Sequence, residues 1–310
     1  VINLLLLFLF KNAAWYYIAA LSVVRILLIG VPRFILALHY SAHRPIIRPT
    51  WLNNLLIEHV ITPFFGLPPG VYRFHHVIMH HREDNIYPYD LSSTMPYQRD
   101  NFPFCYLHYW LRFEFAIWVE LPYYLCLKRY WLMLAQTVFV MVLWFGGNWY
   151  IYHYIRPAIC LWLFLIPQLV LSMALMWGNF SQHIFVDPKH YKDDHRLTVN
   201  LLATPYNQLT FNDGYHIIHH KYPTLHWSEM PKRFVTDREL QLHIDNDAVC
   251  VKDIDWFMLG AHVWFGLWHR LVNKHFVPCN QKQADMSVQE RIQFLKERLP
   301  VIHDRGDDAH

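Results

Sequence analysis

The sequence predicts an all-α integral membrane protein with about four transmembrane helices in two hairpins, interfacial helices, and a histidine-rich cap on one side of the bilayer. Three observations support this fold class. Hydrophobic residues occupy 54% of the 310 positions and charged residues 16%, well below the proportion of charge in soluble domains. Two central apolar runs are long enough to cross a bilayer. The chain also contains 22 histidines, an excess that apolar packing does not explain.

No Gly/Ser-rich or Pro-rich linker divides the chain, so residues 1–310 are predicted to form a single domain. We expect a first hairpin over residues 1–38, two histidine clusters with interfacial helices over 39–129, a second hairpin over 130–180, and a third cluster with a C-terminal cap over 181–310. The formal charge of +3 includes no long basic run, which argues against a nucleic-acid partner. Five scattered cysteines predict reduced, buried thiols.

The first hairpin begins with an apolar segment, residues 1–10, that is only half the length of a span. Because the chain starts with Val, we expect an earlier part to precede it. A turn at Lys11 and Asn12 makes Trp15–Leu38 the second span, with aromatic residues at its interfacial end. This register puts Arg25 deep in the bilayer, at a cost of roughly 2.5–3.5 kcal/mol unless it snorkels or pairs. A turn near Arg25 is the alternative.

The second hairpin is predicted from two apolar runs, Trp131–Gly147 and Ala158–Trp177. The connection between them is rich in Trp and Tyr, which suit a membrane–water interface, and it ends at Pro157, which suits a helix start. Two hairpins return the chain to the side from which it came. We therefore expect His39–Arg129 and the chain after His183 to lie on one face of the bilayer.

Three further helices are expected outside the spans. Residues 51–60 are interfacial, because their apolar residues recur at helical spacing and their Asn and Glu residues lie off that stripe. Residues 104–127 are apolar but interrupted by charges and a proline, so we predict a second membrane-surface helix. Near the C-terminus, Ser287 and Glu290 form a capping-box pattern, and Pro300 predicts the end of that helix.

The first two histidine clusters follow the first hairpin. In HYSAH, His39 and His43 are four residues apart and share one face of a helix, as chelation of a metal requires. In HHVIMHH, His76 and His80 have the same spacing and His81 lies beside them. His75 is an extra candidate. A lone pair of this kind is weak evidence, since surface or core histidines can share the spacing.

The third cluster is HIIHH, in which His216, His219 and His220 converge on one helical face. Upstream, Asn179 and His183 lie one helical turn apart at the end of the last span. His190, His195 and His226 follow nearby, and supporting or structural roles are favoured for them. The clusters together favour a metal site over coincidence.

The number of imidazoles indicates two metal ions, because a structural zinc ion takes four ligands. Imidazole binds iron, zinc, copper and nickel, so the ligand type leaves the metal open. The clusters contain almost no carboxylate, unlike Glu-rich di-iron bundles, and no HExxH zinc-hydrolase motif. Oxidative chemistry is therefore the favoured class.

HYSAH, HVIMHH and HIIHH, in this order and with spans between the second and third, resemble the histidine boxes of the membrane fatty acid desaturase family. The resemblance covers roughly residues 15–235, and the ordered set is specific although each box is not. Asn179 and His183 are similar to the stearoyl-CoA desaturase pattern. Tyr40 departs from relatives that have an acidic residue there, which leaves the substrate subgroup open.

The resemblance implies a di-iron centre that uses O₂ as co-substrate, with no catalytic side chain beyond the metal centre. It implies that Asn179 reaches a metal through water, and that His75, His190 and His195 are extra ligands or support the ligands from outside. The implied ligands themselves are His39, His43, His76, His80, His81, His183, His216, His219 and His220.

The resemblance also implies a fatty acyl desaturase acting on an acyl lipid or acyl-CoA within membrane lipids. A hydroxylase using the same site is an alternative, and so is a structural or lipid-binding subunit of a membrane complex. The sequence has no HPGG haem motif, so electrons are expected from a separate cytochrome b-type carrier or ferredoxin. A multi-pass protein of the endoplasmic reticulum is the expectation, with plastid or mitochondrial membranes as alternatives.

Overall fold

The computed structural model describes residues 9–65, 67–101 and 104–303, which form two compact units. The first unit contains the described residues of 1–79 and 114–175, and the second those of 80–113 and 176–310. The chain passes from one unit to the other inside three helices, η4 (Phe74–His80), α7 (Phe104–Leu127) and α10 (Ile166–Gln182). The single-domain organisation stays a prediction.

The first unit is helical throughout its regular structure. Several of its helices contain π-helical stretches, so that short elements follow one another in continuous runs. Besides the parts of η4, α7 and α10, its elements are α2 (Trp15–Arg25), η1 (Ile26–Phe34), α3 (Ile35–His43), α4 (Thr50–Asn53), η2 (Asn54–Ile61), η3 (Thr62–Phe65), α5 (Val71–Arg73), α8 (Trp131–Tyr150), η5 (Ile151–Ile155), α9 (Pro157–Cys160) and η6 (Leu161–Leu165).

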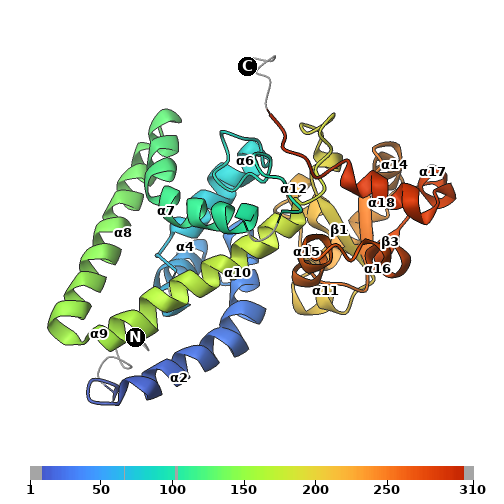
Figure 1. Ribbon diagram of the computed structural model, residues 1–310. Coiled ribbons are helices and arrows are strands. Elements are labelled where there is room, and N and C mark those ends of the chain that lie inside the picture. The colour runs from blue at the N-terminus through green and yellow to red at the C-terminus, as the bar shows by residue number, and fades with distance from the viewer. Residues whose placement is uncertain (1–8, 66, 102–103, 304–310) are drawn as a thin grey trace. The chain divides into compact units, whose positions relative to one another are not determined.

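Two helical runs are long and apolar enough to cross a membrane, Trp131–Ile155 and Pro157–Gln182. Both are longer than the sequence predicted. The first is longer because most of the expected connection is helical, in α8 and η5, and the second because α10 continues beyond Trp177 to Gln182. Only Arg156, in an extended conformation, separates the two runs, and Pro157 occupies the first helical turn as predicted. In Figure 1, α8 descends to meet α9 at the lower left.

The predicted first span falls mostly on residues 1–8, outside the described residues. The turn before the second span is present, because Ala13 N–H donates to Phe10 O at 3.2 Å. Beyond it, Trp15–Val31 and Ile35–His43 are together long and apolar enough for a broken span or a re-entrant loop, with a bend of 44° between them. Arg25 lies inside the helical run and donates to Leu163 O at 3.1 Å, so the alternative turn there is wrong. A count of four spans stays a prediction.

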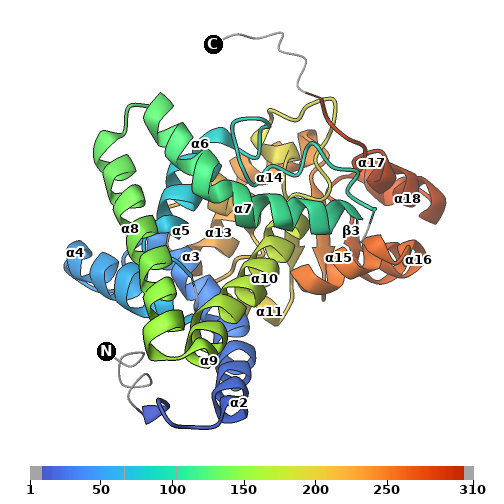
Figure 2. The same cartoon turned by 60° about the vertical axis from the view of Figure 1, so that its left-hand side comes forward.

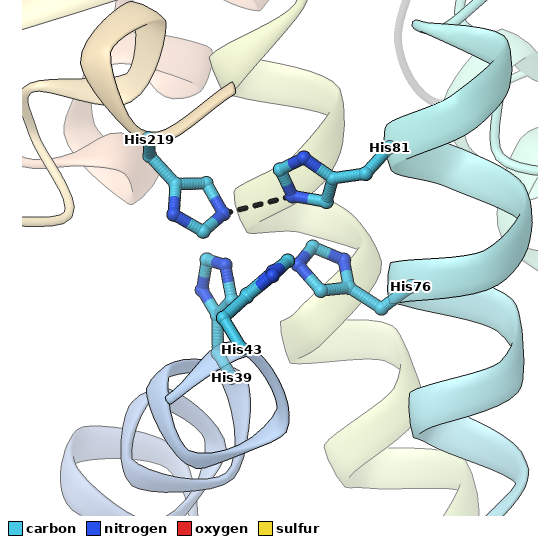
Figure 3. Close-up of side chains that lie close together, drawn as sticks. All are labelled: His39, His43, His76, His81 and His219. Carbon is cyan, nitrogen blue, oxygen red and sulfur yellow. Dashed lines mark hydrogen bonds between the residues drawn. The ribbon is translucent and has the colours of Figure 1, made fainter. Parts of the chain in front are cut away.

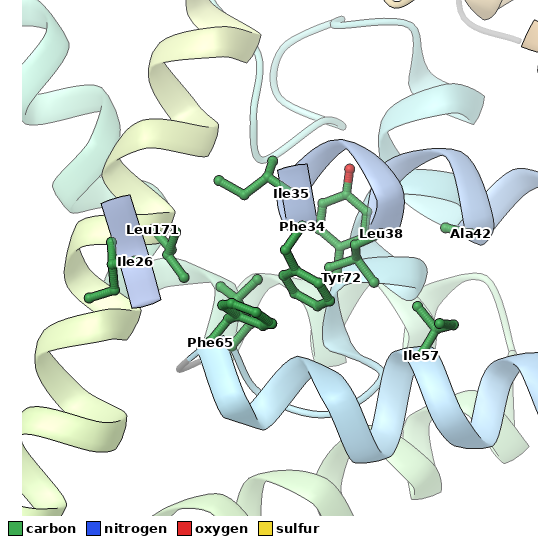
Figure 4. Close-up of a cluster of buried hydrophobic side chains, with 10 residues drawn as sticks. Ile26, Phe34, Ile35, Leu38, Ala42, Ile57, Phe65, Tyr72 and Leu171 are labelled. Atoms are coloured by element: carbon green, nitrogen blue, oxygen red, sulfur yellow. The ribbon is translucent and has the colours of Figure 1, made fainter. Parts of the chain in front are cut away.

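A buried apolar cluster holds the helix that carries the first histidine box (Figure 4). Ile35, Leu38 and Ala42 recur along one face of α3 and enter this cluster. The rings of Phe34 and Phe65 stack within it, with centroids 4.0 Å apart. Packing of these residues fixes the orientation of α3, and His39 and His43 lie one turn apart on an adjacent face.

The predicted helix over residues 51–60 is present as α4 and η2, with its polar side buried. Asn53 is fully buried and accepts hydrogen bonds from the backbone N–H groups of Ile46 and Ile47 at 3.0 and 3.3 Å. Glu58 is also buried and lies 3.7 Å from Arg73. Leu55, on the apolar stripe, is 47% exposed. The buried polar groups are thus paired, as burial requires.

The second unit contains a three-stranded sheet that the prediction of an all-α fold missed. β1 (Val199–Leu202) pairs in parallel with β2 (Val249–Lys252), which pairs antiparallel with β3 (Phe276–Val277). The strands are two to four residues long, too short for a clear alternating pattern. In Figure 2, α16 (Trp268–Arg270) and α18 (Val288–Lys296) lie beside each other.

Short helices make up the remainder of the second unit. α18 begins with the predicted capping box of Ser287 and Glu290, although it ends at Lys296, before Pro300. The other elements are α6 (His81–Glu83), η7 (Asp194–Arg196), α11 (Tyr206–Leu209), α12 (His216–Lys221), η8 (Trp227–Glu229), α13 (Met230–Phe234), α14 (Asp237–Asp245), α15 (Trp256–Trp264), α16 (Trp268–Arg270), η9 (Leu271–His275), α17 (Gln281–Asp285) and α18 (Val288–Lys296).

The five cysteines are free thiols, as predicted, but they are not all buried. Cys160 and Cys250 are buried, whereas Cys126 is exposed. Cys250 and Cys279 are distant in sequence, yet their sulfur atoms lie 3.1 Å apart. This proximity arises because Cys250 lies in β2 and Cys279 directly follows β3.

Candidate metal centre

In the first unit, three imidazoles converge. His39 and His43 project from one face of α3, and their ring centroids are 5.9 Å apart. The ring of His76, from η4, lies 4.4 Å from that of His39 and 4.9 Å from that of His43. Tyr72 stacks on His76 with an interplanar angle of 15°. Figure 3 shows these three imidazoles pointing toward one another.

The second unit contains a buried group of three imidazoles drawn from segments far apart in sequence. His80, His183 and His220 each contribute one ring nitrogen, and these nitrogens lie within 4.8 Å of one another. Their ring centroids are 5.0–5.2 Å apart. Each side chain is at most 8% exposed. We call these residues the box cluster, and donors of this type and spacing fit a metal ion.

Oxygen atoms outside the box cluster face its imidazoles, and those near His80 and His183 are hydrogen-bond acceptors. His80 Nδ1 lies 2.6 Å from a carboxylate oxygen of Asp90, and His220 Nδ1 lies 3.5 Å from Asp84. His183 Nδ1 is 2.9 Å from the carbonyl oxygen of Leu197. These acceptors favour a proton on Nδ1 and a lone pair on Nε2, the arrangement that metal-ligating histidines use.

His183 shows most directly that the cluster fits a cation. It is fully buried, and its Nε2 atom has no hydrogen-bond partner among the described residues. Burial, followed by the nearby His220 and His80, holds the pKa of His183 well below its usual range. The ring is therefore neutral at physiological pH, as metal ligation requires.

A second imidazole pair lies nearby in the same unit. His81 Nε2 and His219 Nε2 are 2.9 Å apart, the contact drawn as a dashed line in Figure 3. The ring of His81 also stacks on that of His220, with centroids 4.5 Å apart. Five of the predicted ligands therefore meet within this unit.

His216 joins this group from its first position on α12. Its ring centroid lies 5.2 Å from that of His183 and 4.8 Å from that of His220. Asp213 lies 3.9 Å from His216 Nδ1, and Trp256 donates to the same carboxylate at 2.7 Å. The structure thus brings all the second-unit ligands predicted from the sequence close together.

Asn179 is predicted to reach a metal through water. In the structure its side-chain amide donates hydrogen bonds to two groups of the second unit. Its Nδ2 donates to the hydroxyl of Tyr109 at 2.7 Å and to the carbonyl of Ser92 at 3.2 Å. Tyr109 in turn donates to the same carbonyl at 3.1 Å. Sequence patterns gave no sign of Tyr109, because it lies 70 residues from Asn179.

The three extra candidates have different surroundings. His75 is buried but belongs to none of the close groups of metal-binding donors among the described residues. His190 is half-exposed and lies 3.1 Å from Asp187. His195 is buried in a separate cluster with Glu239 and another histidine. The sequence also missed Asp84 and Asp90, although both closely follow the second box in the chain.

The model of the fatty acid desaturase family matches residues 13–246, well over half of the chain. The chain belongs to the fatty acid desaturase family. No curated protein and no solved structure matches it. Membership indicates an oxidoreductase of the fatty acid desaturase type, acting on a lipid or acyl substrate. The two apolar runs are consistent with a membrane desaturase, and the histidine clusters can bind metal.

Proposed function

We propose that the protein is an oxygen-dependent fatty acyl desaturase with a di-iron centre at its histidine boxes. The observation that carries the proposal is the box cluster. Its residues, His80, His183 and His220, are buried and close together, and oxygen atoms of neighbouring residues face their outer ring nitrogens. We assign iron on the basis of the family, because imidazole ligands alone do not discriminate between metals.

The ligand assignment extends the box cluster to all nine predicted histidines. His81, His216 and His219 are supported by their proximity to the cluster within the second unit. His39, His43 and His76 are supported by their own convergence in the first unit. Asn179 is proposed to reach a metal through water, and its bond to Tyr109 would fix the amide.

The iron pair would supply the oxidising power, drawn from O₂, that removes hydrogen from an unactivated methylene. The chain's own residues hold and shield the site. Asp90 and the Leu197 carbonyl accept from the outer nitrogens of His80 and His183 and fix their orientation, and the Asp84 carboxylate lies near the outer nitrogen of His220. Burial of His183 and His216 to 0–1% exposure keeps bulk water away from the ligands.

The acyl carrier, the electron donor and the host membrane are proposed from the family. We infer an acyl lipid or acyl-CoA substrate, a separate cytochrome b-type or ferredoxin donor, and a multi-pass location in the endoplasmic reticulum. Hydroxylation at the same site is the second candidate, because both reactions begin with hydrogen removal from a methylene. Product analysis distinguishes an alkene from an alcohol.

The test uses purified protein with a reductase system, and compares His183→Ala with His190→Ala. We expect His183→Ala to lose iron and unsaturated product, because its buried Nε2 then no longer contributes to the cluster. His190, half-exposed and paired with Asp187, is a matched control and should retain both. Iron-replete, active His183→Ala protein would contradict the proposal, and a folded wild-type protein that binds iron without turnover would favour a structural or lipid-binding subunit.

A further inference from the structure

A second cluster of metal-binding side chains lies in the second unit, apart from the histidine boxes. It consists of His195 in η7 and of Glu239 and His243, four residues apart on α14. One donor atom from each residue lies within 4.8 Å of the others. The three residues are only 1–3% exposed. We call them the carboxylate cluster.

The two imidazoles of the carboxylate cluster differ in their partners, and only His243 has a hydrogen-bond acceptor on its outer nitrogen. His243 Nδ1 lies 2.5 Å from the backbone carbonyl of Glu239, one turn earlier on the same helix. Its Nε2 atom is buried and has no hydrogen-bond partner among the described residues. His195 Nδ1 lies 3.8 Å from Asp193, while its Nε2 faces Glu239 at 3.4 Å. Nε2 of His243 is thus available to a ligand, and Nε2 of His195 becomes available if a metal ion replaces its hydrogen bond to Glu239.

Glu239 divides its two carboxylate oxygens between the cluster and its surroundings. Oε1 accepts from the hydroxyl of Tyr222 at 2.6 Å and lies 3.7 Å from Arg233. Oε2 faces His195. A carboxylate held by a donor on one oxygen presents the other as a single, oriented ligand. Arg233 is 38% exposed, so solvent screens its charge from the cluster.

We propose that His195, Glu239 and His243 bind a zinc ion, distinct from the metal centre at the histidine boxes. Two imidazoles and one carboxylate form a common protein ligand set for zinc, with a fourth position taken by water or substrate. The competing account is a metal-free hydrogen-bonded triad of Tyr222, Glu239 and His195. That account gives the buried Nε2 atom of His243 no partner, at an expected cost in stability.

The proposed zinc site is linked to the chain segment that follows the third histidine box through Tyr222. This residue directly follows α12, which carries His216, His219 and His220, and its hydroxyl bonds Glu239. The ion would fix α14 to η7 and thereby fix the carboxylate that holds the end of α12.

The experiment measures zinc and iron separately, by elemental analysis of full-length protein purified in detergent and supplied with zinc after mild chelation. We expect about one zinc ion per chain in the wild type. Glu239→Gln and His243→Ala should lose that zinc while retaining their iron. Glu239→Gln keeps the size of the side chain, so it carries the test if His243→Ala fails to fold.

The matched control is His262→Ala in α15. His262 is also 1% exposed, its Nδ1 also lies near a backbone carbonyl one turn earlier, at 2.7 Å, and its Nε2 is also buried without a partner. It belongs to no group of close metal-binding donors among the described residues. His262→Ala should therefore keep its zinc. Absence of zinc from the wild type, or equal zinc in all variants, overturns the proposal whatever the iron content.

Discussion

The box cluster and the carboxylate cluster lie in the same unit and are equally buried, yet they place carboxylates differently. In the box cluster, His80, His183 and His220 face one another, and acidic groups lie only behind His80 and His220. In the carboxylate cluster, Glu239 lies among the imidazoles. One cluster combines segments distant in sequence, whereas the other takes two of its three members from one helix.

The difference shows how the position of a carboxylate separates two kinds of metal site. A carboxylate behind an imidazole orients the ring and makes it a better ligand, but leaves an all-imidazole face to the metal. A carboxylate among the imidazoles is itself a ligand, and two imidazoles with one carboxylate form a ligand set that zinc uses. The comparison predicts two sites that respond independently to substitution.

The largest expected effect is a difference in desaturase activity between variants of the two clusters. His80→Ala should remove iron and abolish formation of unsaturated product, because the remaining imidazoles cannot complete the site. His243→Ala should retain most of the turnover per folded protein. Product yield by gas chromatography, normalised to folded protein, measures both. Equal loss in the two variants would show that the clusters act as one.

Acid should weaken the carboxylate cluster through His243. Burial, as the first cause, lowers the pKa of His243 from 6.5 to about 4. In the unfolded chain His243 therefore binds a proton below pH 6.5, whereas in the folded chain it stays neutral until the pH falls to about 4. The free energy of unfolding should fall across this window, by about 3 kcal/mol in the metal-free protein.

Chemical denaturation of metal-free protein at pH 7 and pH 4.5 measures this loss. His243→Gln should lose less stability between the two pH values than the wild type, because glutamine does not titrate. The same pH dependence in both proteins would assign the loss to other groups.

The role of the outer carboxylate in the box cluster can be tested with Asp90→Asn. His80 Nδ1 would lose its charged acceptor at 2.6 Å, while the size of the neighbouring side chain stays the same. Iron affinity should fall roughly 10–100-fold, as for other supporting partners of metal ligands. Competition with an iron chelator measures the affinity, and zinc content should not change. Unaltered iron affinity would show that Asp90 does not support metal binding by His80.

The smallest expected effect is a stability control remote from both clusters. Ser287→Ala removes the capping box at the start of α18 and should lower the free energy of unfolding by about 0.5–2 kcal/mol. Iron and zinc content should both stay at wild-type levels. Loss of either metal would mean that general destabilisation, rather than ligand loss, explains the other variants.

Local patterns in the sequence predicted several elements because their causes are local. The apolar runs of the second hairpin, Pro157 at a helix start and the capping box at Ser287 each depend on neighbouring residues. The short strands were missed because they contain too few residues for a periodic signal. The turn proposed near Arg25 was wrong because a tertiary contact, with the carbonyl of Leu163, pairs the guanidinium inside a helix.

By itself, the sequence determined the family and nominated the candidate ligands, because the order and spacing of the histidine boxes can be read along the chain. Only the tertiary structure decided which acceptors stand behind His80 and His183, and that Tyr109 holds Asn179. It alone placed His195 with Glu239 and His243. Such contacts depend on how distant segments pack, and no local pattern of residues encodes them.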